Sequence, residues 1–214
     1  MIKVLIADDH AIVRHGLKQL IAETSDMTVA GEADSGLEAL RMIRSGKLDV
    51  VLMDINMPGK NGIETLKQIR SEWPNLPVVI LSMYPEDQYA VRLIKAGAAG
   101  YLTKESAPEQ LVAALRTVAR GKKFITPAVA ELLANELGGG KDSGAAPHAT
   151  LSDREDQIFR LLASGNTVSD AAEQLSLSVK TVSTYRTRVL EKMGMKNNAE
   201  LTYYAIKNGL IAQP

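Results

Sequence analysis

Apolar runs of strand length alternate with amphipathic stretches through about the first 120 residues of the chain. Five apolar runs are typical of β-strands, at residues 3–7, 27–31, 48–53, 77–82 and 99–102. Helices are predicted between these runs, at residues 11–23, 35–45, 62–73, 85–96 and 108–120, and several of them have apolar residues spaced three or four apart. This regular alternation predicts an α/β domain with a five-stranded, parallel, doubly wound sheet that has helices on both faces.

The pattern changes in the second half of the chain. Residues 126–137 predict one more helix. Residues 138–149 are rich in Gly, Ser, Ala and Pro, which is typical of a flexible linker, with an ordered surface loop as the alternative. Only helices are predicted beyond this point, at about residues 152–164, 168–174, 179–193 and 199–208, as in an all-α, four-helix helix-turn-helix domain. The predicted division is therefore a first domain at 1–122, a linker helix and flexible linker at 123–149, and a second domain at 150–214.

Composition narrows the class of protein. The 214 residues are 45% apolar, which is enough for folded cores, and no apolar stretch is long enough for a membrane span. The absence of cysteine excludes disulfides and thiolate metal sites and is compatible with a reducing cytosol. The formal net charge is zero, so binding to nucleic acid would require a local basic patch.

Polar residues stand where four of the predicted strands end: Asp8 and Asp9, then Asp54, Ser82 and Lys104. The carboxyl ends of parallel strands meet at one edge of a sheet, so these side chains are expected to form an acidic pocket with one cation. Such a pocket suits a hard divalent metal ion and phosphoryl transfer. From the residues alone, Asp54 is the candidate nucleophile, and Asp8 or Asp9 is a candidate metal ligand. Lys104 and Ser82 would contact the phosphoryl group.

Each of these residues has a simpler interpretation when it is taken alone. An Asp at the end of a strand is often a turn residue or a helix cap, and Asp9 could cap the helix predicted from residue 11. Tyr101 could be a half-buried aromatic residue of the sheet. The occurrence of such residues at four strand ends together favours a functional site.

This set of residues resembles the receiver domain of two-component response regulators over residues 1 to about 122. The matching motifs are Asp8-Asp9, Asp54 within Met-Asp-Ile-Asn-Met-Pro-Gly, Ser82, and Tyr101 three residues before Lys104. The resemblance implies a flavodoxin-like fold with Asp54 as the phosphoacceptor. It also implies that Mg²⁺ is held by Asp9, Asp54 and the backbone carbonyl of Asn56, with Asp8 acting through water. Ser82 and Tyr101 would form the switch pair.

The helix predicted at 179–193 concentrates positive charge. Five basic residues and one acid lie between Lys180 and Lys196, which is the electrostatic pattern of contacts to a phosphate backbone. The segment from Thr150 to Ala212 resembles the LuxR-type helix-turn-helix, which makes this helix the recognition helix in the major groove. By that resemblance, Ser183, Thr184 and Thr187 face bases, and Lys180, Tyr185, Arg186 and Arg188 touch or flank phosphates.

The two resemblances together identify the chain as similar to the NarL/FixJ class of response regulators, in its GacA-like subgroup. They imply a cytoplasmic protein with a sensor histidine kinase and double-stranded DNA as partners and a homodimer after phosphorylation. They also imply no enzymatic activity beyond self-phosphorylation and dephosphorylation at Asp54. RNA polymerase is a further candidate partner. Two alternatives remain open. One is an aspartyl-phosphate hydrolase, although Asn56 stands where such enzymes carry a second Asp. The other is a helix-turn-helix that binds protein rather than DNA, because Val168 begins a segment that lacks a basic residue common in the family.

Overall fold

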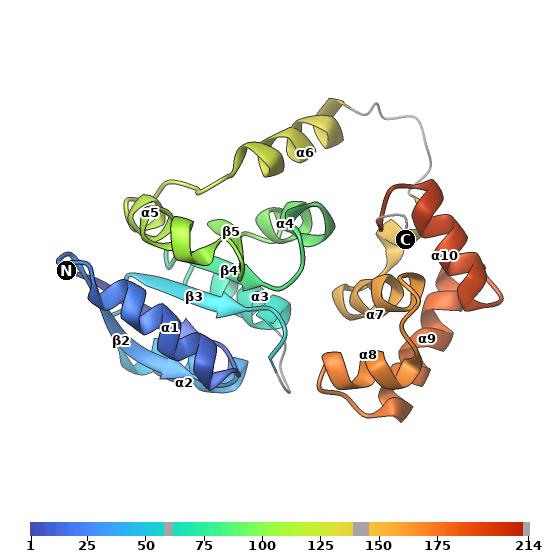
Figure 1. Cartoon of the computed structure of the whole chain (residues 1–214), viewed down its shortest axis with the longest axis horizontal. Helices are drawn as coiled ribbons and strands as arrows, with labels where there is room; N and C mark the ends of the chain where they lie inside the picture. The colour runs from blue at the N-terminus through green and yellow to red at the C-terminus, as the bar shows by residue number, and fades with distance from the viewer. Residues whose placement is uncertain (58–61, 139–145, 212–214) are drawn as a thin grey trace. The chain divides into compact units, whose positions relative to one another are not determined.

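The computed structural model describes residues 1–57, 62–138 and 146–211, and these divide into two compact units, Met1–Gly138 and Gly139–Pro214 (Figure 1). Within the described residues, none of the helices combines the length and the apolar character that a membrane span requires. The predicted fold class, an α/β unit followed by a helical unit, is confirmed. The domain boundaries proposed above remain predictions.

The five predicted strands form one parallel sheet in the order β2-β1-β3-β4-β5. Their bounds are β1 Ile2–Ala7, β2 Met27–Ala33, β3 Val50–Asp54, β4 Val78–Ser82 and β5 Gly100–Thr103. Every residue of β3 is buried, as expected for a central strand that is covered on both faces. All five strands run in the same direction, so their carboxyl ends share one edge of the sheet.

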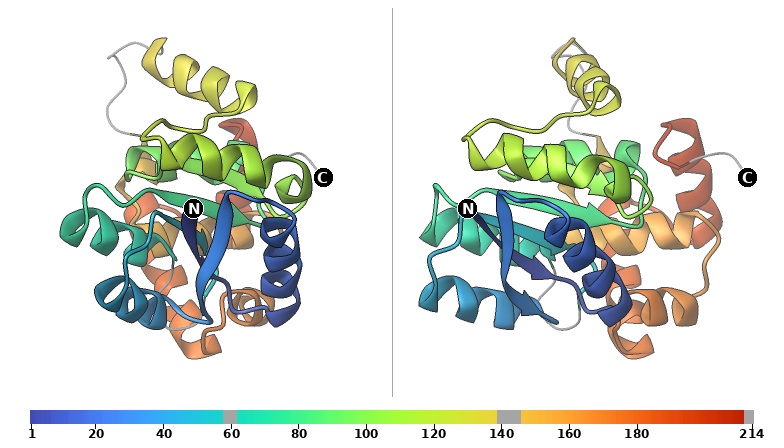
Figure 2. Two further views of the ribbon diagram at one scale, coloured as in Figure 1. Left: turned by 90° about the vertical axis from the view of Figure 1, so that its left-hand side faces the viewer. Right: turned by 60° about the vertical axis from the view of Figure 1, so that its left-hand side comes forward.

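Helices cover both faces of this sheet, as Figure 2 shows. Helices α1 (Ala11–Ala22) and α5 (Ala107–Ala119) pack on one face. Helices α2 (Gly36–Ser45), α3 (Gly62–Glu72) and α4 (Glu86–Lys95) pack on the other. Successive side chains of a strand point to opposite faces, so Ile6 contributes to the first core and Leu5 to the second.

Helix α6 (Pro127–Gly138) belongs to the first unit and packs against α4. Val129 of α6 is buried in the same core cluster as α4 residues. The hydroxyl of Thr126 accepts a hydrogen bond from the Val129 amide and donates one of 2.6 Å to Glu86 Oε2. The start of α6 is therefore attached to the first turn of α4.

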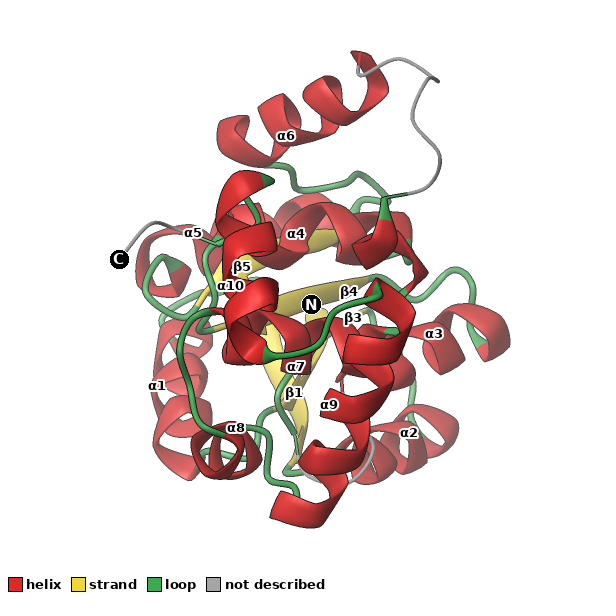
Figure 3. Ribbon diagram, turned by 90° about the vertical axis from the view of Figure 1, so that its right-hand side faces the viewer, coloured by secondary structure: helices red, strands yellow, loops and turns green. Residues whose placement is uncertain are grey.

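The second unit contains α7 (Asp153–Ala163), α8 (Val168–Gln174), α9 (Val179–Met193) and α10 (Asn198–Lys207), which Figure 3 labels. Its core includes Phe159, Val189 and Leu201 from three different helices. Ser152 and Glu155 form the expected capping box at the start of α7. A 3₁₀ helix, Pro147–Thr150, was not predicted, and His148 Nδ1 within it lies 2.8 Å from the Tyr204 hydroxyl. Residues 139–145 of the predicted linker lie outside the described residues.

Candidate functional sites: an acidic pocket and a basic helix

Two buried carboxylates share one lysine at the carboxyl edge of the sheet. Asp8 follows β1, Asp54 ends β3 and Lys104 follows β5. Lys104 Nζ lies 2.7 Å from Asp8 Oδ2 and 2.8 Å from Asp54 Oδ2. The strand register brings Lys104 into place, because Ser82 pairs with Thr103 and the Lys104 amide donates a 2.7 Å hydrogen bond to the Ser82 carbonyl. Three of the side chains predicted to meet at this edge, those of Asp8, Asp54 and Lys104, therefore do so.

A close backbone approach fixes the segment after β3. The Gly62 amide donates a hydrogen bond to the Ile55 carbonyl, and a Cβ atom at Gly62 would lie only 2.3 Å from the Asp54 carbonyl oxygen. Glycine is required here because any side chain would displace the backbone that carries Asp54. The Asn56 amide then donates a 3.1 Å hydrogen bond to Asp54 Oδ1. Pro58 and Gly59, the last residues of the sequence motif around Asp54, lie outside the described residues.

The carboxylates described in this pocket outnumber its single amine, and burial and charge together shift the pKa values of Asp54 and Lys104. Burial raises the pKa of the Asp54 carboxyl, and the neighbouring Asp8 carboxylate acts in the same direction, while Lys104 opposes them. Burial works to lower the pKa of Lys104, but the carboxylates of Asp54 and Asp8 outweigh it and raise that pKa above its usual value. The pocket therefore favours binding of a further cation.

The donor atoms at this edge fit a hard divalent metal ion. Single ligand atoms of Asp8, Asp9, His10 and Asp54 lie within 4.8 Å of one another. The side-chain oxygen of Asn56 is buried and has no hydrogen-bond partner among the described residues. Carboxylate and carbonyl oxygens are the ligands that Mg²⁺ prefers, so the residues present suit this ion.

His10 is a member of this cluster that the sequence reasoning missed. Its Nδ1 lies 3.2 Å from Asp8 Oδ1 and 2.9 Å from Asp9 Oδ1, and its backbone amide donates a 2.8 Å hydrogen bond to Asp8 Oδ1. Arg14 adds a 2.7 Å hydrogen bond from its guanidinium to the Asp8 carbonyl. The position of His10, directly after the paired acids, was the available signal.

Ser82 and Tyr101 form hydrogen bonds with the backbone amide and the backbone carbonyl of the same residue, Tyr84. The Tyr84 amide donates a 3.0 Å hydrogen bond to Ser82 Oγ. The Tyr101 hydroxyl donates one of 2.7 Å to the Tyr84 carbonyl. Both Ser82 and Tyr101 are buried. Tyr101 is an aromatic residue of β5, as the simpler interpretation has it, but it is fully buried in the core beside α4 rather than half-buried.

Most of the residues expected to contact DNA lie on the surface of α9. Lys180, Ser183, Thr184, Thr187 and Arg188 are exposed, while Val182 and Val189 are buried against the rest of the unit. Ser178 caps the helix at its start through the Thr181 amide, and Gly194 ends it in a left-handed conformation.

Three side chains on or near this surface have partners within the second unit. Arg186 is half-buried, and its Nε donates a 2.7 Å hydrogen bond to Asn198 Oδ1. Lys192 is paired with Glu155 at 2.7 Å. The Arg188 guanidinium lies 5.6 Å from the centre of the Tyr185 ring. Lys180 and Arg188 are therefore the exposed cations of α9 that face solvent without a carboxylate partner in the described part of the chain.

Comparison with known protein families assigns both units. Residues 4–116 match the response regulator receiver domain, and residues 149–205 match the bacterial regulatory proteins of the luxR family. The chain is a response regulator of the NarL/FixJ class. Response regulator GacA of Pseudomonas aeruginosa is 39% identical over 211 residues, which cover 99% of this chain and 98% of that protein. Response regulator UvrY of Escherichia coli is 37% identical over 211 residues, which cover 98% and 96% of the two chains.

Solved structures agree with this family. RcsB from Salmonella enterica serovar Typhimurium, bound to promoter P1flhDC in the presence of the phosphomimetic BeF₃⁻, is 28% identical with a TM-score of 0.64. The match covers 95% of this response regulator and 97% of that chain. An RcsB–DNA complex matches with 27% identity and a TM-score of 0.59, covering 99% of each chain. The family consists of DNA-binding transcription regulators rather than classical enzymes, so the hydrolase alternative loses its support.

Proposed function

We propose that this response regulator is a phosphorylation-controlled transcription factor that acts in the cytoplasm. Asp54 receives a phosphoryl group from a sensor histidine kinase, and the second unit binds operator DNA as a dimer. The single observation that supports this most strongly is the ion-pair cluster of Lys104 with Asp8 and Asp54 in a chain that also carries the LuxR-type α9.

The chemical step uses Asp54 as the nucleophile. A carboxylate oxygen of Asp54 attacks the phosphorus of a phosphohistidine, the P–N bond breaks, and the histidine nitrogen that leaves takes up a proton. The product is an acyl phosphate on Asp54, so the only covalent change to this chain is at that residue. Lys104 already contacts Asp54 Oδ2 and would contact a phosphoryl oxygen after transfer.

Mg²⁺ is the proposed cofactor of this step. Asp9, Asp54 and the Asn56 carbonyl would hold it, with Asp8 acting through water. When bound, the ion neutralises the charge that develops on the phosphoryl oxygens. The excess of carboxylate over amine in the pocket supports the proposal, because one lysine does not neutralise Asp8, Asp9 and Asp54 together.

The switch is proposed to pass through Tyr84. A phosphoryl group on Asp54 attracts the Ser82 hydroxyl, and Ser82 Oγ is at present the acceptor for the Tyr84 amide. A change at Ser82 therefore moves the same residue whose carbonyl is held by Tyr101. Phosphorylation would bias two arrangements of this loop and of the adjoining α4 surface.

DNA recognition is assigned to α9. Ser183, Thr184 and Thr187 would face bases, and Lys180, Tyr185, Arg186 and Arg188 would touch or flank phosphates. Dimerisation through α10 would match a two-fold symmetric operator, and the exposed Tyr203 of α10 is consistent with a contact surface there. RNA polymerase is a further proposed partner. Binding of the second unit to protein alone is the alternative.

A salt-dependent gel shift with operator DNA tests this proposal. Each phosphate contact contributes about 0.9 to the slope of log affinity against log salt, so Lys180→Ala with Arg188→Ala should reduce the slope by about 2. Lys47→Ala, which removes an exposed cation of the first unit, serves as the control and should leave the slope unchanged. A slope that is equal in the double variant and the parent would favour a protein partner instead.

A further inference from the structure

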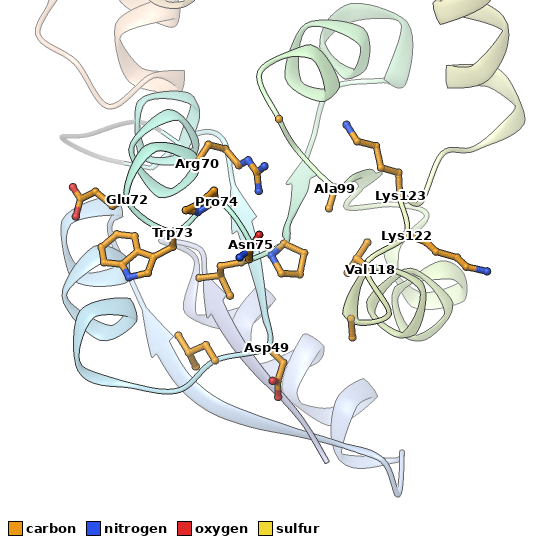
Figure 4. A pocket seen from close by; sticks show the side chains of 16 residues that line it. Asp49, Arg70, Glu72, Trp73, Pro74, Asn75, Ala99, Val118, Lys122 and Lys123 are labelled. Atoms are coloured by element: carbon orange, nitrogen blue, oxygen red, sulfur yellow. The ribbon is translucent and has the colours of Figure 1, made fainter.

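A cavity of about 820 Å³ lies at the amino edge of the sheet, the edge opposite Asp54. Its lining residues precede β3, β4 and β5 or come from the end of α5 and the segment after it, as Figure 4 shows. Among the labelled residues, Asp49, Trp73, Ala99 and Lys123 come from these four segments. The volume is in the range of small-molecule binding sites. Nothing in the proposed phosphoryl transfer or DNA binding uses this cavity.

The acidic residues that line the cavity have hydrogen-bond or ion-pair partners, whereas its basic residues lack carboxylate partners in the part of the chain that the structure describes. The acids have partners: Asp49 Oδ2 accepts a 2.8 Å hydrogen bond from the Lys3 amide, and Glu72 pairs with Arg44 at 3.1 Å. The bases that line it, Arg70, Lys122 and Lys123, form no ion pair with a carboxylate of the described chain. Figure 4 shows Arg70 and Lys123 on opposite sides of the cavity. The cavity therefore presents positive charge that no carboxylate among the described residues neutralises.

A glycine leaves space for the Arg70 side chain at this site. Gly97 has φ +105°, and a Cβ atom there would lie 3.0 Å from both Cγ and Nε of Arg70. A glycine at this position leaves room for the Arg70 side chain to lie across the α4–β5 loop. Arg70 is half-buried and makes no hydrogen bond within the described residues. A guanidinium that is partly withdrawn from water without an acceptor is suited to a bound carboxylate or phosphate.

We propose that this cavity binds a small organic anion with a phosphate or carboxylate headgroup on an apolar body. The headgroup would accept hydrogen bonds from Arg70 and Lys123. The apolar body would lie against Trp73 and Leu76, which line the same cavity and are half-buried. A bound anion would bridge α3 to the segment that joins α5 and α6. The proposal goes beyond the function above and requires neither Asp54 nor DNA.

Tryptophan fluorescence of the full chain tests this site directly, because Trp73 is the single tryptophan in the sequence. We would titrate with benzoate and phenyl phosphate in EDTA, so that no divalent cation recruits the anion to the acidic pocket. A saturable change is expected with at least one probe, and the tighter probe identifies the headgroup. Benzyl alcohol, which has the ring but no charge, should bind at least about tenfold more weakly.

Matched variants locate the binding. Arg70→Gln and Lys123→Gln should each weaken binding about tenfold or more, and Arg70→Lys should restore part of it. Arg41→Gln, which removes an exposed cation of α2 outside the cavity, should bind like the parent, and so should Asp54→Asn. Three results would each overturn the proposal. They are equal binding by the parent and Arg70→Gln, a fluorescence response that does not saturate, and loss of binding in Asp54→Asn. Because Asp54→Asn cannot be phosphorylated but should still bind the anion, failure of this proposal can be told apart from failure of the proposed phosphorylation.

Discussion

The Tyr101 hydroxyl donates a 2.7 Å hydrogen bond to the backbone carbonyl of Tyr84, whose amide is bound by Ser82 Oγ. Tyr84 thus connects the end of β4, beside the proposed phosphorylation site, to a buried tyrosine of β5. Because backbone atoms of Tyr84 make both contacts, a shift of Ser82 changes the acceptor that Tyr101 uses. These two hydrogen bonds are the physical connection through which a change at Ser82 would reach Tyr101 in the proposed switch.

Tyr101→Phe should break this route while leaving the phosphorylation site intact. The ring stays buried, and loss of one buried hydrogen bond should lower the free energy of unfolding by about 1 kcal/mol. Acyl-phosphate treatment should still modify Asp54, but the gain in DNA affinity should fall. Gel shifts with and without acetyl phosphate measure this. Tyr84→Phe retains the backbone acceptor and is the control; an undiminished gain in Tyr101→Phe would remove Tyr101 from the switch.

Asp54→Asn should raise the melting temperature of the first unit in buffer without divalent cations. Two buried carboxylates now share one amine, and burial with Asp8 nearby raises the pKa of Asp54. An acid whose pKa is raised on folding destabilises the fold when it is ionised, so a neutral isostere relieves that cost. Thermal unfolding followed by Trp73 fluorescence tests this, and a lower melting temperature would show that the ion pair dominates.

Lys104→Gln should have the opposite effect. It leaves Asp8 and Asp54 buried without their shared cation, and removal of one partner from a buried pair costs about 3–5 kcal/mol. Added Mg²⁺ should recover part of this loss, because the ion no longer competes with the amine for the carboxylates. Urea unfolding with EDTA and with Mg²⁺ gives the comparison. Equal stability of the parent and Lys104→Gln in EDTA would contradict the charge account.

Glu155 should make the stability of the second unit depend on pH. Burial works to raise the pKa of its carboxyl, but Lys192 and the Ser152 backbone amide outweigh burial and hold the pKa below its usual 4.5. The stabilisation is therefore fully present above pH 4.5 and is lost as the pH falls through the lowered value. Glu155→Gln should be less stable than the parent at pH 7, and the difference should close in acid. Urea unfolding of the second unit, followed by NMR at pH 7 and in acid, measures this difference in stability.

The sheet and its acidic edge could be predicted because both depend on local patterns. Apolar runs define the strands, and parallel strands bring Asp8, Asp54 and Lys104 to one edge wherever the connecting helices lie. Strand ends differ by a residue or two from the predictions, because apolar content does not indicate where the backbone hydrogen bonding between strands stops. In β3, for example, the strand begins at Val50 rather than at residue 48.

The contacts that join distant side chains could not be predicted in this way. The hydrogen bond from Thr126 to Glu86 depends on how α6 packs on α4, and no spacing within either helix encodes it. The 3₁₀ helix at Pro147–Thr150 depends on the contact of His148 with Tyr204, 56 residues away. Both features arise from tertiary packing and not from the periodicity of the segment itself.

Intact-mass measurement of phosphoryl uptake tests the central claim most directly. The full chain is incubated with acetyl phosphate and Mg²⁺, in parallel with Asp54→Asn and with Asp34→Asn, which alters an exposed acid outside the pocket. The account predicts one phosphoryl group on the parent and on Asp34→Asn, none on Asp54→Asn, and loss of the modification when Mg²⁺ is removed with EDTA. A phosphoryl group that persists on Asp54→Asn would contradict it.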